Sequence, residues 1–388
     1  MRLAIDAHNL RDGGGLTHLV ELLAAADPPA HGFDSVTVWA NEATLDCLPD
    51  RPWLNRASAW LLNGPLPARL CWQRIQLPAL LSGQDLLFVP GGTYIGSFRP
   101  FVVMSRNLLP FDIHERIRFG LSMRLRFVLL ERVQAASFRC ASGVIFLTGK
   151  AREVVEKRMG GPVNGEVAVI PHGVSDVFRH EPRSQRSLAA CSSDDPFRWL
   201  YVSSIMVYKH QWHVAEAIAK LRMQGLPVAL DLIGPPTPEG LRRLRESLAR
   251  FDPMGAFIRY LGPVSYAELT THYHKADGFV FASSCETFGQ ILVEAMSAGL
   301  PIACSDRSAM PEILGNAGLY FDPERPETIA SAMTTLMDDP LLRERLSWAA
   351  YARAQYYSWG QCARETFSFL ARVAGTRSVD TKSLFGNT

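Results

Sequence analysis

Residues 283–302, SSCETFGQILVEAMSAGLPI, place two glutamates, Glu286 and Glu294, eight positions apart. The preceding run GFVFAS (278–283) is short and apolar and predicts a buried strand, so SCET is expected to form the loop at its carboxyl end. We predict that a helix begins near Phe288 and carries Glu294 about one and a half turns further on. Glu286 is then a loop residue, whereas Glu294 lies inside an apolar helix.

The residues around this helix start indicate what the two acids could bind. The amides of Phe288, Gly289 and Gln290 would be donors at a helix N terminus, which favours an anion. Glycine at position 289 lets the backbone approach a ligand closely. Carboxylates beside such amides fit a ligand with sugar hydroxyls, phosphate and ribose in sequence, which describes a sugar nucleotide. The plainer alternative is that Glu286 is a solvated acid and that Glu294 caps a neighbouring amide.

Length and composition bound the class of protein. At 388 residues the chain suits two domains, and its hydrophobic content of 47% indicates a well-packed globular protein. A net charge of +2 argues against nucleic acid as a partner, since nucleic-acid-binding proteins usually carry a strong basic excess. The chain opens on a predicted strand and no apolar run approaches about 18 residues. We therefore expect a cytoplasmic protein without a membrane span.

Short apolar runs alternate with amphipathic stretches throughout the chain. The apolar runs predict strands at 2–6, 35–40, 85–90, 101–105, 143–148, 166–171, 199–204, 228–234, 257–262, 278–283 and 301–305. Helical patterns between them include 15–26, 211–225 and 266–276. This alternation predicts an α/β fold with parallel sheets covered by helices on both faces.

A polar stretch rich in Ser and Pro, residues 179–197, is the best candidate for a linker. It divides the chain into two doubly wound, Rossmann-like domains, which we place at 1–180 and 195–350. Ligands of such sheets bind at the carboxyl ends of the strands. A cleft shared by two facing domains is therefore the default site.

Residues 285–302, CETFGQILVEAMSAGLPI, resemble the glutamate-x7-glutamate motif of the retaining glycosyltransferases of family 4, the group 1 glycosyltransferases with the GT-B fold. The next segment, SDRSAMPEILGNAGLYFDP (305–323), is also similar to that family. The resemblance implies that Glu286 contacts a donor-sugar hydroxyl, that Glu294 contacts the ribose hydroxyls, and that Thr287 lies among the donor contacts. It also implies a first domain that binds the acceptor and a C-terminal helix, about 352–375, that crosses back to complete it.

Lys209, in the segment YVSSIMVYKHQW (201–212), is a lone cation at the carboxyl end of a predicted strand. A departing diphosphate would need such a charge, although a lone lysine is more often simply solvated. The family carries a Gly-Arg pair followed by a lysine here. Lys209 matches the lysine, but Ser203, Ser204 and Ile205 stand at the place of the pair. The resemblance therefore implies Lys209 and Ser204 as donor-binding residues, with the second cation unassigned.

The first half offers two further groups of candidate residues. Gly14 and Gly15 belong to a glycine run between a predicted strand and a helix, where amides could face a phosphate or sugar, or simply form a flexible turn. After the strand at 101–105 many relatives carry a His-Asp pair. This chain has Arg106 and Asn107, and then His114. Either Arg106 contacts the acceptor, or His114 supplies the imidazole, or Arg106 merely caps a helix.

Residues 116–139, RIRFGLSMRLRFVLLERVQAASFR, are basic and apolar. A basic amphipathic helix can rest on an anionic membrane and give access to a lipid-linked acceptor. The alternative is a long helix packed in the first domain, with arginine side chains that extend to the surface.

The function expected from these features is transfer of a sugar from a nucleotide-diphosphate sugar to an acceptor hydroxyl. Retention, and a role in bacterial surface polysaccharide or O-antigen assembly with mannosyl- or glucosyl-type transfer, follow from the resemblance. Glu286 and Lys209 are the expected catalytic residues, and the histidines show no metal-binding constellation, so we expect neither a metal nor a cofactor. The alternatives are another GT-B enzyme, such as a sugar-nucleotide epimerase or a glycan phosphorylase, and an inactive protein that binds nucleotide sugars.

Overall fold

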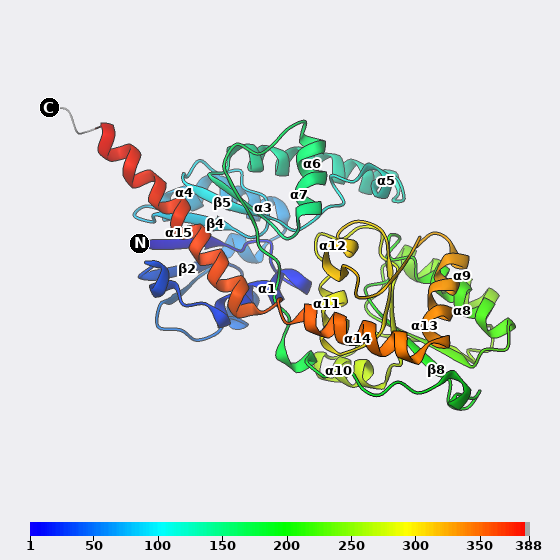
Figure 1. Cartoon of the computed structure of the whole chain (residues 1–388). Helices are drawn as coiled ribbons and strands as arrows, with labels where there is room; N and C mark the ends of the chain where they lie inside the picture. The colour runs from blue at the N-terminus through cyan, green and yellow to red at the C-terminus, as the bar shows by residue number, and fades with distance from the viewer. Residues whose placement is uncertain (385–388) are drawn as a thin grey trace. The chain divides into compact units, whose positions relative to one another are not determined.

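The computed structural model describes the backbone of residues 1–384 and the side chains of residues 1–375. The chain forms two compact units (Figure 1). Unit 1 comprises Met1–Ile113, Leu121–Gly173 and the chain from Ser358 onward, and unit 2 comprises His114–Gly120 and Val174–Tyr357. The chain therefore enters unit 2 first in a short excursion and then again after Gly173.

Unit 1 contains a seven-stranded parallel sheet in the order β3-β2-β1-β4-β5-β6-β7. Sequence order reverses between β1 and β4, so this pair forms the topological switch point of the sheet, where doubly wound folds bind ligands. The strands are β1 (Arg2–Asp6), β2 (Ser35–Trp39), β3 (Leu54–Ala57), β4 (Leu86–Val89), β5 (Phe101–Ser105), β6 (Gly143–Phe146) and β7 (Glu166–Val169).

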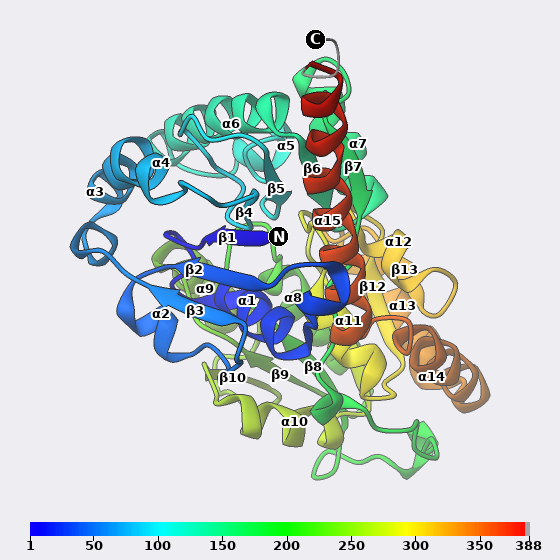
Figure 2. The ribbon, with the colours of Figure 1, turned by 90° about the vertical axis from the view of Figure 1, so that its left-hand side faces the viewer.

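Helices cover the sheet of unit 1, and the C-terminal helix α15 packs against α1 (Figure 2). Phe367 of α15 contacts Phe33, with ring centroids 6.2 Å apart. The helices are α1 (Gly13–Ala25), α2 (Glu42–Asp46), α3 (Leu66–Cys71), α4 (Leu77–Leu80), α6 (Leu121–Cys140), α7 (Gly149–Met159) and α15 (Trp359–Leu384), with the short α5 (Ile113–Arg116) at the passage to unit 2. Single turns are η1 (Pro28–His31), η2 (Trp60–Asn63) and the π-helical η3 (Trp72–Gln76).

Unit 2 contains a six-stranded parallel sheet in the order β10-β9-β8-β11-β12-β13, with its switch point between β8 and β11. The strands are β8 (Phe197–Val202), β9 (Val228–Ile233), β10 (Ile258–Gly262), β11 (Gly278–Phe281), β12 (Ile302–Ser305) and β13 (Leu319–Phe321). The helices are α8 (Gln211–Met223), α9 (Pro238–Phe251), α10 (Tyr266–Lys275), α11 (Gln290–Ser297), α12 (Met310–Leu314), α13 (Pro326–Asp338) and α14 (Pro340–Ala354), with single turns η4 (Asp176–Phe178) and η5 (Leu188–Ala190).

The predicted α/β fold class is confirmed. Runs of buried apolar side chains form the central strands, as in β4, β6 and β11, because both faces of a parallel sheet are covered by helices. Two strands were not predicted. β3 is a four-residue edge strand, LNRA, with two exposed side chains, and β13 has only three residues, so neither carries a clear periodic pattern.

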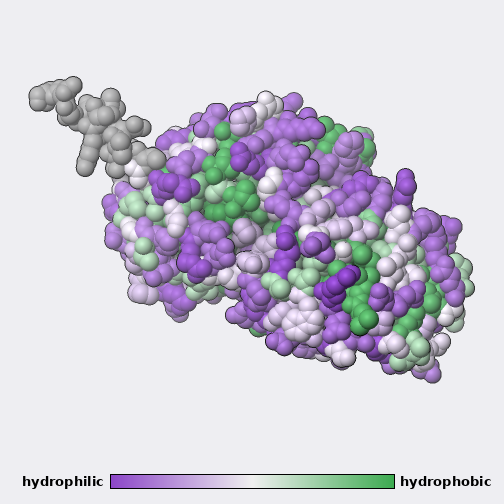
Figure 3. Space-filling view, in the orientation of Figure 1, coloured by the Kyte–Doolittle hydropathy of each residue, from purple (hydrophilic) through white to green (hydrophobic). Residues whose placement is uncertain are grey.

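Helix α6 packs through one face and exposes the other. Its buried side chains include Phe127 and Phe138. On the opposite face, Leu121, Leu125 and Leu129 are 77%, 71% and 64% exposed on successive turns. Hydrophobic residues accordingly appear among hydrophilic ones on the surface over α6 (Figure 3).

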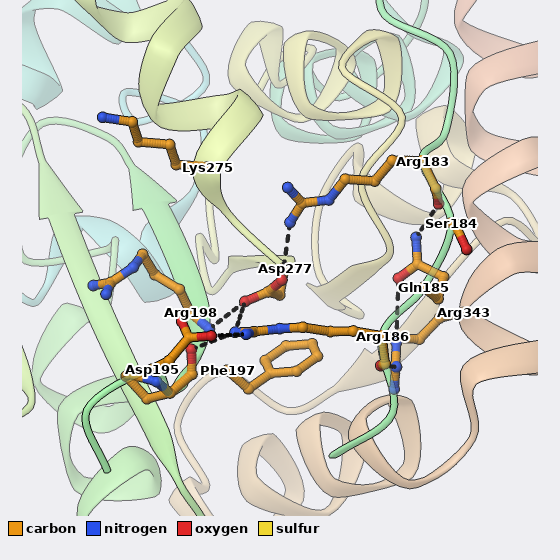
Figure 4. Close-up of a pocket in the computed structure, with 11 residues that line it drawn as sticks. Arg183, Ser184, Gln185, Arg186, Asp195, Phe197, Arg198, Lys275, Asp277 and Arg343 are labelled. Atoms are coloured by element: carbon orange, nitrogen blue, oxygen red, sulfur yellow. Dashed lines mark hydrogen bonds and ion pairs between the residues drawn. The ribbon is translucent and has the colours of Figure 1, made fainter. Parts of the chain in front are cut away.

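Residues 179–197, the predicted linker, are bound to unit 2 (Figure 4). Arg183 and Arg186 both pair with Asp277, at 2.9 and 2.8 Å. The fully buried Arg343 donates to the Arg186 carbonyl and to the Leu336 and Met337 carbonyls at the end of α13. A cavity of about 320 Å³ lies among these side chains. Most of the charged side chains that line the cavity form ion pairs with one another. These ion pairs hold residues 179–197 against the sheet.

Candidate functional site

Two charged side chains meet at the switch point of unit 2. Lys209 lies in the loop after β8 and Glu286 in the loop after β11, and Lys209 Nζ donates a hydrogen bond to Glu286 Oε1. The two side chains are only 8% and 17% exposed, so both charges are largely withdrawn from water. The structure thus brings together the lysine and the first glutamate of the predicted site.

The loop that carries Lys209 is held by a local network. The Tyr201 hydroxyl donates to the Lys209 carbonyl, and the Ser284 amide donates to the Tyr208 carbonyl at 2.9 Å. His210 has a left-handed backbone, with φ of 52°, and its Nε2 lies 2.9 Å from Ser284 Oγ. Burial, followed by the charge of His213, lowers the pKa of His210 to about 2. His210 is therefore neutral, and its contact with Ser284 connects the two loops.

Ser308 holds the backbone of Glu286. The Glu286 amide donates to Ser308 Oγ at 3.0 Å, and Ser308 Oγ donates to the Glu286 carbonyl at 2.7 Å. Ser308 also has a left-handed backbone, with φ of 57°. Sequence reasoning missed this residue, although it lies in the segment that resembles the family, because an isolated serine gives no indication of its partner.

Helix α11 begins at Gln290, two residues later than predicted, because Gly289 forms its N-cap with φ of 90°. Phe288 is buried and contacts Tyr357 at 5.5 Å between ring centroids. The N-terminal turn of α11 therefore lies in the same loop region as Glu286. A helix N terminus leaves amide donors outside the helical ladder, which suits a phosphate.

Glu294 is buried in α11 and does not cap an amide. It accepts a hydrogen bond from the Tyr273 hydroxyl of α10, at 3.1 Å to Oε2. Burial raises the pKa of Glu294 to about 7, and the bond from Tyr273 acts in the opposite direction. Sequence reasoning missed Tyr273, since nothing in the local pattern of α10 points to a carboxylate on another helix.

The other donor candidates of unit 2 lie in these same loops. The Ser204 carbonyl accepts a hydrogen bond from Gln211 Nε2 at 3.0 Å, so Ser204 helps to hold the start of α8 in place.

Two arginines also lie near this site, because the charges of Arg118 and Arg307 act on His210, the neighbour of Lys209. Both arginines are ion-paired, Arg118 with Glu115 and Glu324 and Arg307 with Asp306 and Asp322.

In unit 1, the glycine run forms the first turn of α1 and not a loop before it. A Cβ at Gly15 would lie 3.1 Å from Leu10 Cδ2 and 3.2 Å from Arg106 Nη1, whereas Gly14 has open space. Arg106 Nη2 donates to the Gly14 carbonyl at 2.5 Å. Burial lowers the pKa of Arg106 to about 10. Arg106 therefore contacts the glycine turn at the start of α1.

The three acceptor candidates are not gathered at one place within a unit. Asn107 Oδ1 accepts the Leu109 amide at 3.1 Å and so shapes its own turn in unit 1. His114 belongs to unit 2, where it is exposed and lines a cavity of about 520 Å³ together with Glu115, Ile117, Arg118, Arg307 and Glu324.

A buried polar group at the carboxyl end of β1 was not predicted. His8 Nδ1 lies 2.8 Å from Asp6 Oδ1, and Gln73 Nε2 donates to Asp6 Oδ2 at 2.6 Å and to the Thr93 carbonyl at 2.9 Å. An acid at the end of a buried strand, followed two residues later by a histidine, is the sequence feature that could have found it.

Two observations concern the described residues as a whole. Among them, no group of three or more His, Cys, Asp and Glu side chains gathers in a way that could hold a metal ion. None of the helices described has the length and apolar character needed to cross a membrane.

The site can now be compared with known proteins. Residues 190–354 match the family model described as "Glycosyl transferases group 1". O-antigen chain mannosyltransferase B of Escherichia coli is 37% identical over 112 residues, which cover 29% of this chain and 29% of that protein. A D-inositol 3-phosphate glycosyltransferase of Nocardioides sp. is 26% identical over 240 residues, covering 58% and 52%. The structure of sucrose-phosphate synthase from Thermosynechococcus elongatus aligns with a TM-score of 0.74 at 18% identity, covering 97% and 100%.

The two parallel α/β sheets and the alignment with this structure show the GT-B fold. The part of the chain from residue 190 to residue 354 is similar to the group 1 glycosyltransferases. The regions that align span 29% and 52% of the lengths of the two curated relatives.

Proposed function

We propose that this protein transfers a sugar from a nucleotide-diphosphate sugar to an acceptor hydroxyl with retention at the anomeric carbon. The observation that carries this proposal is the Lys209–Glu286 pair at the switch point of unit 2. Glu294 follows on the helix that leaves the same loop. The similarity to an O-antigen mannosyltransferase and to an inositol phosphate glycosyltransferase supports this reaction class.

The donor would replace the partners that the charged residues have in the free protein. Lys209 and Glu286 neutralise each other now. With the donor bound, the ammonium group of Lys209 pairs with the diphosphate, and a sugar hydroxyl donates a hydrogen bond to the carboxylate of Glu286. Glu294 accepts the ribose hydroxyls. The remaining donor contacts come from Ser204, Thr287, Phe288, Gly289 and Gln290.

In the chemical step, the bond between the anomeric carbon and the phosphate oxygen breaks. The acceptor oxygen forms the new bond on the same face, and its proton passes to the departing phosphate oxygen. Lys209 stabilises the negative charge that develops on the diphosphate, and removing one such group from an active site typically lowers kcat by about 10²–10³. Glu286 holds the sugar in the reactive orientation. This scheme requires no metal ion.

We further propose that the acceptor is a saccharide on a lipid-linked carrier, as used in bacterial surface polysaccharide assembly. The exposed face of α6 supports this proposal, because Leu121, Leu125 and Leu129 lie beside the exposed arginines Arg126 and Arg132. Apolar side chains can enter the acyl boundary of a membrane while arginines meet anionic headgroups. Unit 1 would then rest on an anionic membrane without crossing it.

The proposal is tested by incubating the purified protein with UDP-, GDP-, TDP- and ADP-sugars and lipid-linked acceptors. We expect a glycosylated product whose anomeric configuration, read by NMR, equals that of the donor. Lys209→Met and Glu286→Gln should abolish transfer, whereas Lys220→Met, at a lysine of α8 whose side chain is 29% exposed, should not. Donor binding without transfer to any acceptor would instead identify an inactive binding protein, and an inverted product would refute retention.

A further inference from the structure

Two arginines lie at the switch point of the sheet in unit 1. Arg11 stands between β1 and α1, and Arg69 lies in α3. The loop after β1 also contacts the loop after β4, since Asn9 Nδ2 donates to the Gly91 carbonyl at 3.5 Å. The arginines therefore lie at the edge of the sheet where doubly wound folds generally bind ligands.

Backbone carbonyls hold both guanidinium groups. Arg11 Nη2 donates to the Leu62 carbonyl at 2.6 Å and lies 3.3 Å from the Gly64 carbonyl. Arg69 Nη1 donates to the His8 carbonyl at 2.9 Å. The Nε atoms of both side chains are buried and have no hydrogen-bond partner. Each arginine is thus fixed in position while part of its donor capacity is unused.

The two positive charges lack a counter-charge. In the described part of the chain, neither Arg11 nor Arg69 lies within 4.0 Å of a carboxylate, the distance that defines an ion pair. The nearby carboxylate of Asp6 is already engaged by His8 and Gln73. Burial and then the charge of Arg11 lower the pKa of Arg69. Two partly buried like charges without an anion repel each other, which is the arrangement expected of a site that an anionic ligand completes.

Guanidinium groups recognise one ligand chemistry particularly well. Their planar, forked donors match the oxygens of a phosphate, and charge-assisted hydrogen bonds to phosphate are stronger than neutral ones. We propose that Arg11 and Arg69 bind a phosphate or diphosphate group, and that this group belongs to the acceptor. The assignment to the acceptor rests on the proposed transferase function, whereas the binding of phosphate does not.

The binding step is tested with inorganic pyrophosphate, titrated by calorimetry into the full-length protein carrying Lys209→Met. This background removes the cation of the donor site. We expect binding that Arg11→Gln and Arg69→Gln each weaken by about tenfold or more. Arg74→Gln is the matched control, because Arg74 is an exposed arginine of the neighbouring η3 whose guanidinium donates to a backbone carbonyl, that of Ile95. Absence of binding, or equal binding by all variants, would overturn the proposal.

Thermal unfolding without ligand separates a ligand site from a structural role. Arg69→Gln removes a repulsive, partly buried charge, so the Tm of the free protein should stay equal or rise. A Tm loss well beyond that of Arg74→Gln, with pyrophosphate binding retained, would assign Arg69 a structural role and overturn the proposal.

The source of the phosphate is tested by kinetics. Arg69→Gln should raise the KM for an acceptor with a phosphate or diphosphate group at least about tenfold, and should leave the KM for the same saccharide without phosphate unchanged. Equal effects on both acceptors would refute the acceptor assignment. A protein that binds pyrophosphate through these arginines but transfers no sugar would refute the proposed function alone.

Discussion

Lys209 and Glu286 stand 77 positions apart in the chain and form an ion pair at the switch point of unit 2. The strands β8 and β11 that precede them are neighbours in the sheet, and His210 and Ser284 fasten the two loops together. The pair is therefore in place before a donor arrives. In the proposed function, Lys209 would exchange this partner for the diphosphate, and Glu286 would exchange Lys209 for a sugar hydroxyl.

The Lys209–Glu286 pair should also contribute to stability. Lys209→Met or Glu286→Gln leaves one largely buried charge unpaired, so each should lower the free energy of unfolding by about 3 kcal/mol, the lower end of the range for such pairs. The double variant should recover most of this loss but remain inactive. Urea unfolding and transfer assays measure both effects.

The control for this cycle is the more exposed pair Lys220–Glu327, with side chains 29% and 69% exposed, whose double replacement by Met and Gln should change neither stability nor transfer. Additive losses in the Lys209 and Glu286 double variant would show that the two side chains do not interact.

Nucleotide binding should depend on the ionisation of Glu294, whose pKa is about 7 in the folded protein against an ordinary value of 4.5. The ribose hydroxyls need a carboxylate as acceptor, so nucleotide affinity should rise as the pH increases through about 7. Tyr273→Phe removes a bond that lowers this pKa and should shift the affinity profile to higher pH. Calorimetry from about pH 5 to about pH 9 tests both expectations.

The raised pKa of Glu294 also predicts how the free energy of unfolding changes with pH. Between pH 4.5 and about 7 the folded protein keeps the Glu294 proton that the unfolded chain releases. The folded state then binds more protons, so this group's contribution to the free energy of unfolding falls as the pH rises through that window. Glu294→Gln should remove that part of the slope in urea unfolding. An unchanged slope would show that Glu294 titrates normally.

Gly289→Ala should weaken nucleotide binding. Gly289 has φ of 90°, and an added Cβ would lie 2.6 Å from the flexible end of Met310, so either the end of Met310 or the backbone at the start of α11 must shift. Gly160→Ala is a matched control with φ of 80° and open space around the new methyl group. Both variants should lose about 1–2 kcal/mol of stability, the cost of a left-handed alanine. Only Gly289→Ala should lower nucleotide affinity, measured by calorimetry.

Transfer should persist in EDTA, because Lys209 supplies the positive charge that neutralises the leaving diphosphate. The initial rate in EDTA should match the rate in a parallel sample with added Mg²⁺. Loss of transfer in EDTA that only added Mg²⁺ or Mn²⁺ restores would contradict this prediction.

Leu125→Glu together with Leu129→Glu should abolish binding to liposomes that contain anionic lipid, since both side chains would otherwise enter the membrane interface. Arg126→Glu together with Arg132→Glu should weaken the binding in a salt-dependent way. Nucleotide affinity should stay unchanged in both. Leu341→Glu, at a leucine of α14 that is 78% exposed, is the control. Co-flotation measures binding, and wild-type protein that fails to float would refute the membrane proposal.

Several features of this protein follow from the sequence because their cause is local. Most strands of both sheets, but not β3 and β13, were predicted as short apolar runs, since a strand covered on both faces needs apolar side chains at every position. Glu286, Glu294 and Lys209 were found for a similar reason. Each belongs to a contiguous motif at the end of a strand or the start of a helix. The resemblance of that motif to a known family is visible in the sequence itself, and the match over residues 190–354 confirms it.

Tertiary structure alone decided which of these residues meet. No short stretch of the sequence shows that Lys209 pairs with Glu286 or that Tyr273 donates a hydrogen bond to Glu294. Nor does any short stretch show that Asp277 and Arg343 bind residues 179–197 to unit 2. These contacts depend on strand order in the sheets and on how helices pack over them. The same holds for Arg11 and Arg69, which look like ordinary surface arginines in the sequence. Only the fold shows that their Nε atoms are buried without a hydrogen-bond partner, which is the observation behind the proposed phosphate site.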